Sequence, residues 1–261
     1  MMKLDQKGFT IPELTTMMVV GLMFSILIIF FGFNFWRTAA LQEADQDTLI
    51  TRLNAGDFIR DNIGESSGLI VQNGLTDDHV LNADPNQPNG LYWLPIHAIS
   101  DTNIPMGNEG TYTPLLYFKK FSFNSSKNII MNSSVPYEDE FVMYLDGSTK
   151  KIMSRSIANP NALDNRLLSS CPPAIANSNC PADKVVAEDV ASVDVRYFSR
   201  NGTILDFTSS TDESPPYDFN GPDFPLVEVV ELKINLRKKA IFESSDSTFN
   251  NTIIRISLRN S

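Results

Sequence analysis

The chain has 261 residues, of which 42% are apolar and 20% charged, and its formal net charge is −10. These values suit one helical stalk plus one globular domain of about 200 residues, which is long enough for a hydrophobic core of its own. The acidic balance excludes non-specific nucleic-acid binding by the bulk of the domain, because that binding needs Lys and Arg to neutralise phosphates.

The first feature along the chain is an apolar run from Leu14 to Trp36 that contains no charged residue. Its roughly 23 residues are long enough for a helix to cross a hydrocarbon core about 30 Å thick. No Ala-x-Ala-like cleavage site follows the run, so it is not a secretory signal peptide. Glu13 lies at its N-terminal edge, where a carboxylate needs a partner if it enters lipid.

A short polar leader precedes this run and ends at Gly8, followed by Phe9 and, four residues later, Glu13. The stretch Gly8-Phe9-Thr10-Ile11-Pro12-Glu13 resembles the class III signal of type IV pilins and pseudopilins. The resemblance implies that a prepilin peptidase cleaves after Gly8 and methylates the new N-terminus at Phe9. It also implies that Glu13 pairs with the terminal amine of a neighbouring subunit. The alternative is that Glu13 is an interfacial acid favoured by the dipole at the helix start.

The resemblance implies an α+β, pilin-like fold in which a long N-terminal helix packs on a C-terminal antiparallel sheet. We expect a leader at 1–8, a transmembrane helix at 9–36, an amphipathic stalk helix at 37–64 and an extracytoplasmic β-rich domain at 65–261. The Gly and Ser residues at 64–68 end the helix. The apolar stripe of the stalk is predicted from spacings near three and four. It comprises Leu41, Ala44, Thr48 or Leu49, Leu53 and the segment 59–63.

The rest of the chain is predicted to form strands and loops. Two hairpins are expected, one around Asp146-Gly147 and one around Asn201-Gly202, because these dipeptides suit tight turns. Alternation of apolar and polar residues indicates strands with one buried face. The predicted strands are 69–72, 114–124, 129–131, 140–145, 150–156, 190–199, 203–207, 225–237 and a last one carrying Ile253, Ile256 and Leu258. Their order resembles the C-terminal part of W-type minor pilins and J-type pseudopilins.

Cys171 and Cys180 are the only cysteines, nine residues apart in a loop rich in Pro and Asn. The loop would face an oxidising compartment, so we predict a disulfide between them.

Few residues point to catalysis or metal binding. His79 and His97 are the only histidines and have no zinc-like spacing, and no nucleophile elbow or phosphate-binding loop is present. We therefore do not expect an enzyme or a cofactor. Asp218, Asn220 and Asp223 could offer oxygen ligands to calcium, but they lack the EF-hand order, and a solvated loop is the preferred interpretation.

These observations predict a minor pilin-like subunit that initiates a type IV filament or caps its tip, since a domain of this size is awkward to repeat at every position. Its partners would be other pilin subunits, the prepilin peptidase and the inner-membrane assembly platform. Lys3 and Lys7 favour a cytoplasmic N-terminus, which gives a single-pass inner-membrane protein with its domain outside until it enters an extracellular filament. One alternative is a pseudopilin of type II secretion or competence DNA uptake. Another is a membrane-anchored extracellular binding protein or adhesin, which needs no cleavage at Gly8.

Overall fold

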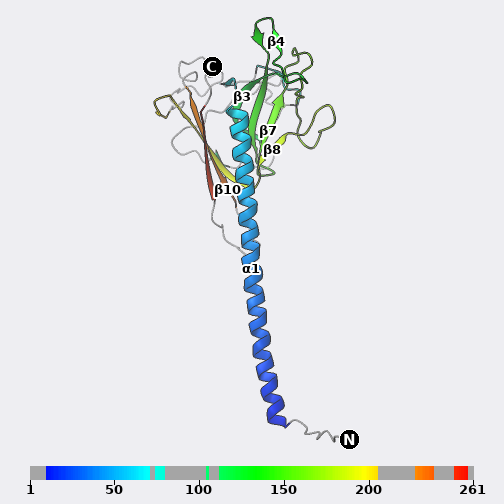
Figure 1. Cartoon of the computed structure of the whole chain (residues 1–261), viewed down its shortest axis with the longest axis vertical. Coiled ribbons are helices and arrows are strands. Elements are labelled where there is room, and N and C mark those ends of the chain that lie inside the picture. Colours follow the sequence, from blue (N-terminus) through cyan, green and yellow to red (C-terminus); the bar gives the residue numbers. More distant parts are fainter. Residues whose placement is uncertain are drawn as a thin grey trace. The chain divides into compact units, whose positions relative to one another are not determined.

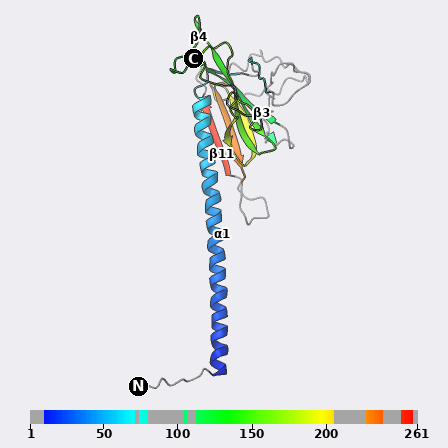
Figure 2. The same cartoon turned by 90° about the vertical axis from the view of Figure 1, so that its right-hand side faces the viewer.

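The computed structural model (Figures 1 and 2) describes residues 10–70, 74–79, 104–105, 112–204, 227–237 and 250–257. One α-helix, α1 (Ile11–Ile63), is followed by antiparallel strands in an α+β arrangement, as predicted. The helix contributes to two compact units: its residues through Asp47 belong to the first unit, and those from Thr48 onward to the second, which holds the strands.

The strands of the second unit form two larger sheets and a short ribbon. The five-stranded sheet has the order β1-β3-β6-β7-β8, the four-stranded sheet the order β11-β10-β9-β2, and β4 and β5 pair alone. Every neighbouring pair is antiparallel. The strands are β1 (Gly68–Ile70), β2 (Ile104–Pro105), β3 (Tyr112–Phe121), β4 (Met131–Asn132), β5 (Val135–Pro136), β6 (Glu138–Asp146), β7 (Lys151–Ile157), β8 (Lys184–Ala187), β9 (Val190–Phe198), β10 (Val229–Leu236) and β11 (Asn250–Ser257).

The last turns of α1 share one hydrophobic core with both larger sheets, and Figure 1 shows them beside β3 and β10. Ala55, Ile59 and Ile63 of the helix are buried in this core together with residues of β3, β6, β7, β9 and β10. The helix ends as predicted, because Gly64 N–H still donates to the Arg60 carbonyl at 2.9 Å while Ser66 N–H turns back to the Ile63 carbonyl at 3.0 Å.

The predicted stripe of the stalk is confirmed at most of its positions. Leu41 and Ala44 are half-buried, and Thr48, Ile59 and Ile63 are buried. Leu53 is the exception, at 57% exposed, and of the two alternatives Thr48 and Leu49 only Thr48 is correct, since Leu49 is 52% exposed. Residues one position apart on a helix point about 100° apart, so a stripe through Thr48 leaves Leu49 on a different face. The buried Ala55 takes the place on the stripe that was assigned to Leu53.

The hairpin at Asp146-Gly147 exists, but its turn is not the tight two-residue turn that was predicted. Asp146 pairs with Lys151, so residues 147–150 form the loop, and the positive φ of 57° belongs to Lys150. The Asp146 carboxylate accepts hydrogen bonds from the backbone N–H of Ser148 at 2.9 Å and of Thr149 at 3.3 Å. Because the Asp146 side chain accepts these bonds, it stabilises the loop 147–150 in place of the shorter turn that was predicted.

Of the hairpin predicted at Asn201-Gly202, the described residues show the turn. Gly202 has a φ of 76°, and Ile204 forms a bridge to Phe198. Along its length β9 also pairs with β10, which lies far along the chain. Residues 205–207 lie outside the described residues.

One further strand prediction needs correction. The strand expected at 129–131 begins at Met131 and pairs within the ribbon, while Ile129 only bridges Phe123. In the last strand, Ile253 is 59% exposed, because Ile254 and Ile256 occupy the buried face of β11. The polar face of β10 is not open to water, since Glu231 is 4% exposed and forms an ion pair with Arg255. Leu258 lies outside the described residues.

Candidate functional site

The start of α1 carries the Glu13 half of a capping box, in which the carboxylate reaches back to Thr10. The Glu13 carboxylate accepts hydrogen bonds from the Thr10 backbone N–H at 2.9 Å and from the Thr10 hydroxyl at 2.8 Å, both on Oε2. A Thr followed three residues later by a Glu is the known signature of this motif. Pro12 lies in the first turn, where its missing N–H leaves no helical bond unmade. Glu13 therefore anchors the helix start within its own chain.

The segment that follows Glu13 is exposed on every side. All residues from Ile11 to Ala39 are exposed, and an 18-residue window within α1 has a mean hydropathy of 2.5. Its hydroxyl groups bond inside the helix: Thr15 donates to the Ile11 carbonyl at 3.1 Å and Ser25 to the Gly21 carbonyl at 2.9 Å. A helix whose polar groups are satisfied internally suits a hydrocarbon environment. Within the described residues, α1 is the one helix long and apolar enough to span a membrane.

The predicted cleavage site and calcium loop cannot be placed. Gly8 and Phe9 lie outside the described residues, as do His97, Asp218, Asn220 and Asp223. The leader at 1–8 remains a prediction from the sequence.

The two cysteines are joined as predicted. Cys171 and Cys180 form a disulfide with their Cα atoms 5.6 Å apart. Backbone bonds hold the closed loop in place: Cys171 N–H donates to the Pro181 carbonyl and Asp183 N–H to the Cys171 carbonyl, both at 2.8 Å. Closing a loop of this length stabilises the fold by roughly 2 to 3 kcal/mol in the chain-entropy description.

The disulfide loop adjoins a buried charge network that the sequence analysis missed. The Arg155 side chain is 0% exposed and bonds to Asp183 at 2.6 Å and to Asp77 at 3.0 Å. Asp183 also accepts the hydroxyls of Tyr144 and Ser170, each at 2.6 Å. Burial, together with the hydrogen bond to Asp183, raises the pKa of Tyr144 above its ordinary value. Such a network is stable only when all its members are paired.

His79 belongs to this region, although its sequence position indicates no ligand set. One of its ring nitrogens and the two cysteine sulfurs lie within 4.8 Å of one another. Both cysteines are bonded to each other, so their thiolates are not available to a metal. The backbone of His79 has a structural role instead, because its carbonyl accepts a hydrogen bond from Arg155.

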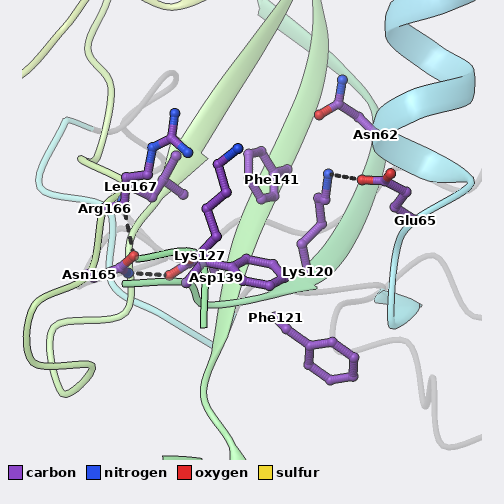
Figure 3. A pocket seen from close by; sticks show the side chains of 11 residues that line it. Asn62, Glu65, Lys120, Phe121, Lys127, Asp139, Phe141, Asn165, Arg166 and Leu167 are labelled. Carbon is purple, nitrogen blue, oxygen red and sulfur yellow. Dashed lines mark hydrogen bonds and ion pairs between the residues drawn. The ribbon is translucent and has the colours of Figure 1, made fainter. Parts of the chain in front are cut away.

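The second unit also carries a groove between the end of α1, β6 and the segment 158–183, and Figure 3 shows the larger of its two hollows. Two adjoining hollows of about 490 and 340 Å³ share Asn62, Phe141, Arg166 and Leu167 in their walls. Its lining combines aromatic rings with the cations Lys120, Lys127, Arg166 and Lys184. No pattern of the sequence pointed to it, because its walls come from segments far apart along the chain.

Comparisons with models of known protein families, with curated proteins and with solved structures find no match for this chain.

Proposed function

We propose that this chain is a minor pilin-like subunit of a type IV filament, processed by a prepilin peptidase after Gly8. The observation that carries the proposal is the helix start: α1 begins at Ile11, directly after the Gly8-Phe9 junction, with Glu13 as the last charge before an apolar, wholly exposed segment. Exposed apolar helices of this kind can pack against one another in a filament core once they leave the membrane.

The role of Glu13 has two candidate explanations that the structure makes separable. As a cap, the residue needs only an oxygen that accepts from Thr10. As the partner of a neighbouring subunit's terminal amine, it needs a negative charge, since an unpaired ammonium in an apolar core is costly. Only Oε2 of the carboxylate bonds to Thr10, so Oε1 can accept from an incoming amine without loss of the cap.

The first experiment is the N-terminal mass of the protein purified from its native cells. A chain that starts at N-methylated Phe9 is the expected result. An intact Met1 start, in cells with an active prepilin peptidase, would reject the proposal and leave a membrane-anchored binding protein.

A matched set of variants then tests the pairing. We expect Glu13→Gln, which keeps a cap acceptor but removes the charge, to stay in the membrane and to be absent from sheared filaments. Thr10→Ala keeps the charge and weakens the cap by about 1 kcal/mol, and should enter filaments normally. The opposite pattern would assign Glu13 to capping alone.

The groove favours a second candidate, a membrane-anchored extracellular binding protein. The two functions are compatible, because a subunit at a filament tip can also carry a binding surface on its outer domain. Assignment to a pilus rather than to type II secretion or competence follows from which machine loses function when the chain is deleted.

A further inference from the structure

The groove has aromatic side chains in its wall, and packing against the sheet holds them in place. Phe141 of β6 lies in its wall (Figure 3). It stacks on the buried Phe118 of β3, with ring centroids 5.2 Å apart and planes 5° from parallel. Phe58 of α1 and Leu167 complete the apolar surface in the hollow of about 340 Å³. Side chains held by such packing lose little freedom when a ligand covers them, which favours binding.

Three cations at this groove have no carboxylate partner within the part of the chain that the structure describes. Lys127 and Arg166 are exposed and form no ion pair there, and Lys184 Nζ lies 4.5 Å from the centroid of the Phe58 ring. Lys120 is paired, since its Nζ lies 3.2 Å from Glu65. The lining thus has four cations against the two acids Glu65 and Asp139, a local charge of +2 on a chain of −10.

The backbone fixes the positions of two of these cations. Lys127 has a φ of 63° in a turn where the Asn124 carboxamide accepts from the N–H groups of Ser126 at 3.0 Å and Asn128 at 2.9 Å. A non-glycine residue with positive φ costs free energy that other contacts must offset.

Arg166 is held by its N–H, which donates to the Phe123 carbonyl at 2.8 Å. The preceding Asn165 donates its amide to Asp139 at 2.7 Å. The backbone that carries Lys127 and Arg166 is therefore fixed by hydrogen bonds within the folded unit.

We infer that this groove binds an acidic segment of a partner protein, with carboxylates on Lys127, Arg166 and Lys184 and an apolar side chain against Phe141 and Phe58. Arg recognises carboxylates with paired hydrogen bonds, and opposite charge steers such a segment to the groove. A nucleic acid fits less well, because the acidic chain repels a polyanion at long range and Asp139 and Glu65 lie in the groove wall.

The test uses the full chain in a non-ionic detergent micelle and a fluorescein-labelled hexapeptide, Glu-Asp-Phe-Asp-Glu-Leu. The expected result is saturable binding by fluorescence polarisation that weakens at high salt, since exposed charges are screened. The same peptide with Gln and Asn in place of its acids should bind at least about tenfold more weakly.

Arg166→Glu is the diagnostic variant, because its side chain is exposed and unpaired within the described residues. It should weaken peptide binding by about tenfold or more. The control is Arg200→Glu, which makes the same charge change at an 86% exposed side chain outside the groove and should leave binding unchanged. Circular dichroism melts of both variants show whether each is folded.

Three outcomes would overturn the inference: no saturable peptide binding, equal binding of the uncharged peptide, or equal losses in the folded Arg166→Glu and Arg200→Glu variants. A single-stranded oligothymidylate that binds in an Arg166-dependent way, where the peptide does not, would assign the groove to nucleic acid instead. None of these measurements requires filament assembly, so failure here leaves the proposed function standing.

Discussion

At the residue scale, the buried Arg155 connects distant segments of the second unit. Arg155 joins segments that are 78 and 28 residues away in the chain, through Asp77 and Asp183. Its guanidinium has no access to water, so loss of either carboxylate would leave a buried charge without full compensation, which typically costs about 3 to 5 kcal/mol. Asp183 also fixes the base of the disulfide loop, because its N–H bonds to the Cys171 carbonyl.

Asp146 gives a pH-dependent prediction at the residue scale. Burial would raise the pKa of its carboxyl, but hydrogen bonds from Ser148 and Thr149 outweigh burial and lower the pKa below the ordinary 3.8. A group with a depressed folded-state pKa stabilises the fold above its unfolded pKa and loses that contribution as pH falls through the folded value. We expect Asp146→Ala to lower the free energy of unfolding by about 1 kcal/mol at neutral pH and by progressively less below about pH 4.

Urea titrations at several pH values, followed by circular dichroism in detergent micelles, measure this difference. Asp61→Ala is the control, since Asp61 is exposed on α1 and accepts no hydrogen bond within the described residues. A deficit in Asp146→Ala that stays constant down to the acid limit would contradict the assignment.

At the scale of the element, α1 is one continuous helix whose two ends have different environments. Its first part is exposed on all sides, and its last turns bury Ala55, Ile59 and Ile63 in the sheet core. Lys184 and Phe58 add a cation–π contact at 4.5 Å between β8 and the helix. The end of the helix is therefore a structural part of the second unit.

The buried stripe of α1 predicts unequal effects of two similar substitutions. Ile59 is 0% exposed, so Ile59→Ala should lower the free energy of unfolding by about 2 to 4 kcal/mol through lost burial and a cavity. Leu53, which is 57% exposed, is the matched control on the same helix, and Leu53→Ala should change stability by no more than about 0.5 kcal/mol. Urea unfolding of the full chain in detergent compares them, and similar losses would show that both residues face the core.

At the scale of the whole molecule, we expect a single-pass membrane protein with its C-terminal domain outside the cytoplasm. A chain carrying alkaline phosphatase after Ser261 should remain in the membrane pellet after alkaline carbonate extraction and should be enzymatically active, because that reporter requires export. β-Galactosidase at the same position is the control and should be inactive. An active β-galactosidase fusion would reverse the orientation that Lys3 and Lys7 favour.

The sequence by itself determined the features that depend on neighbours a few residues apart. The apolar run, the helix end at Gly64, the strands β3, β6, β7, β9 and β10, and the Cys171–Cys180 bond were all predicted correctly. The spacing of Thr10 and Glu13 also indicates the hydrogen bonds between them at the helix start, which the sequence interpretation of Glu13 did not include. These features follow from local periodicity, turn chemistry and short chain separations.

Only the tertiary structure decided which faces are buried and what lies next to what. The division into two larger sheets, the pairing of β9 with β10, and the exposure of Leu53 and Ile253 depend on contacts between distant segments. The same is true of the Arg155 network and of the cationic groove, whose walls come from α1, β6 and the segment 158–183. Side-chain periodicity reports that a residue has a buried face, but the element that covers that face is set by packing of the whole chain.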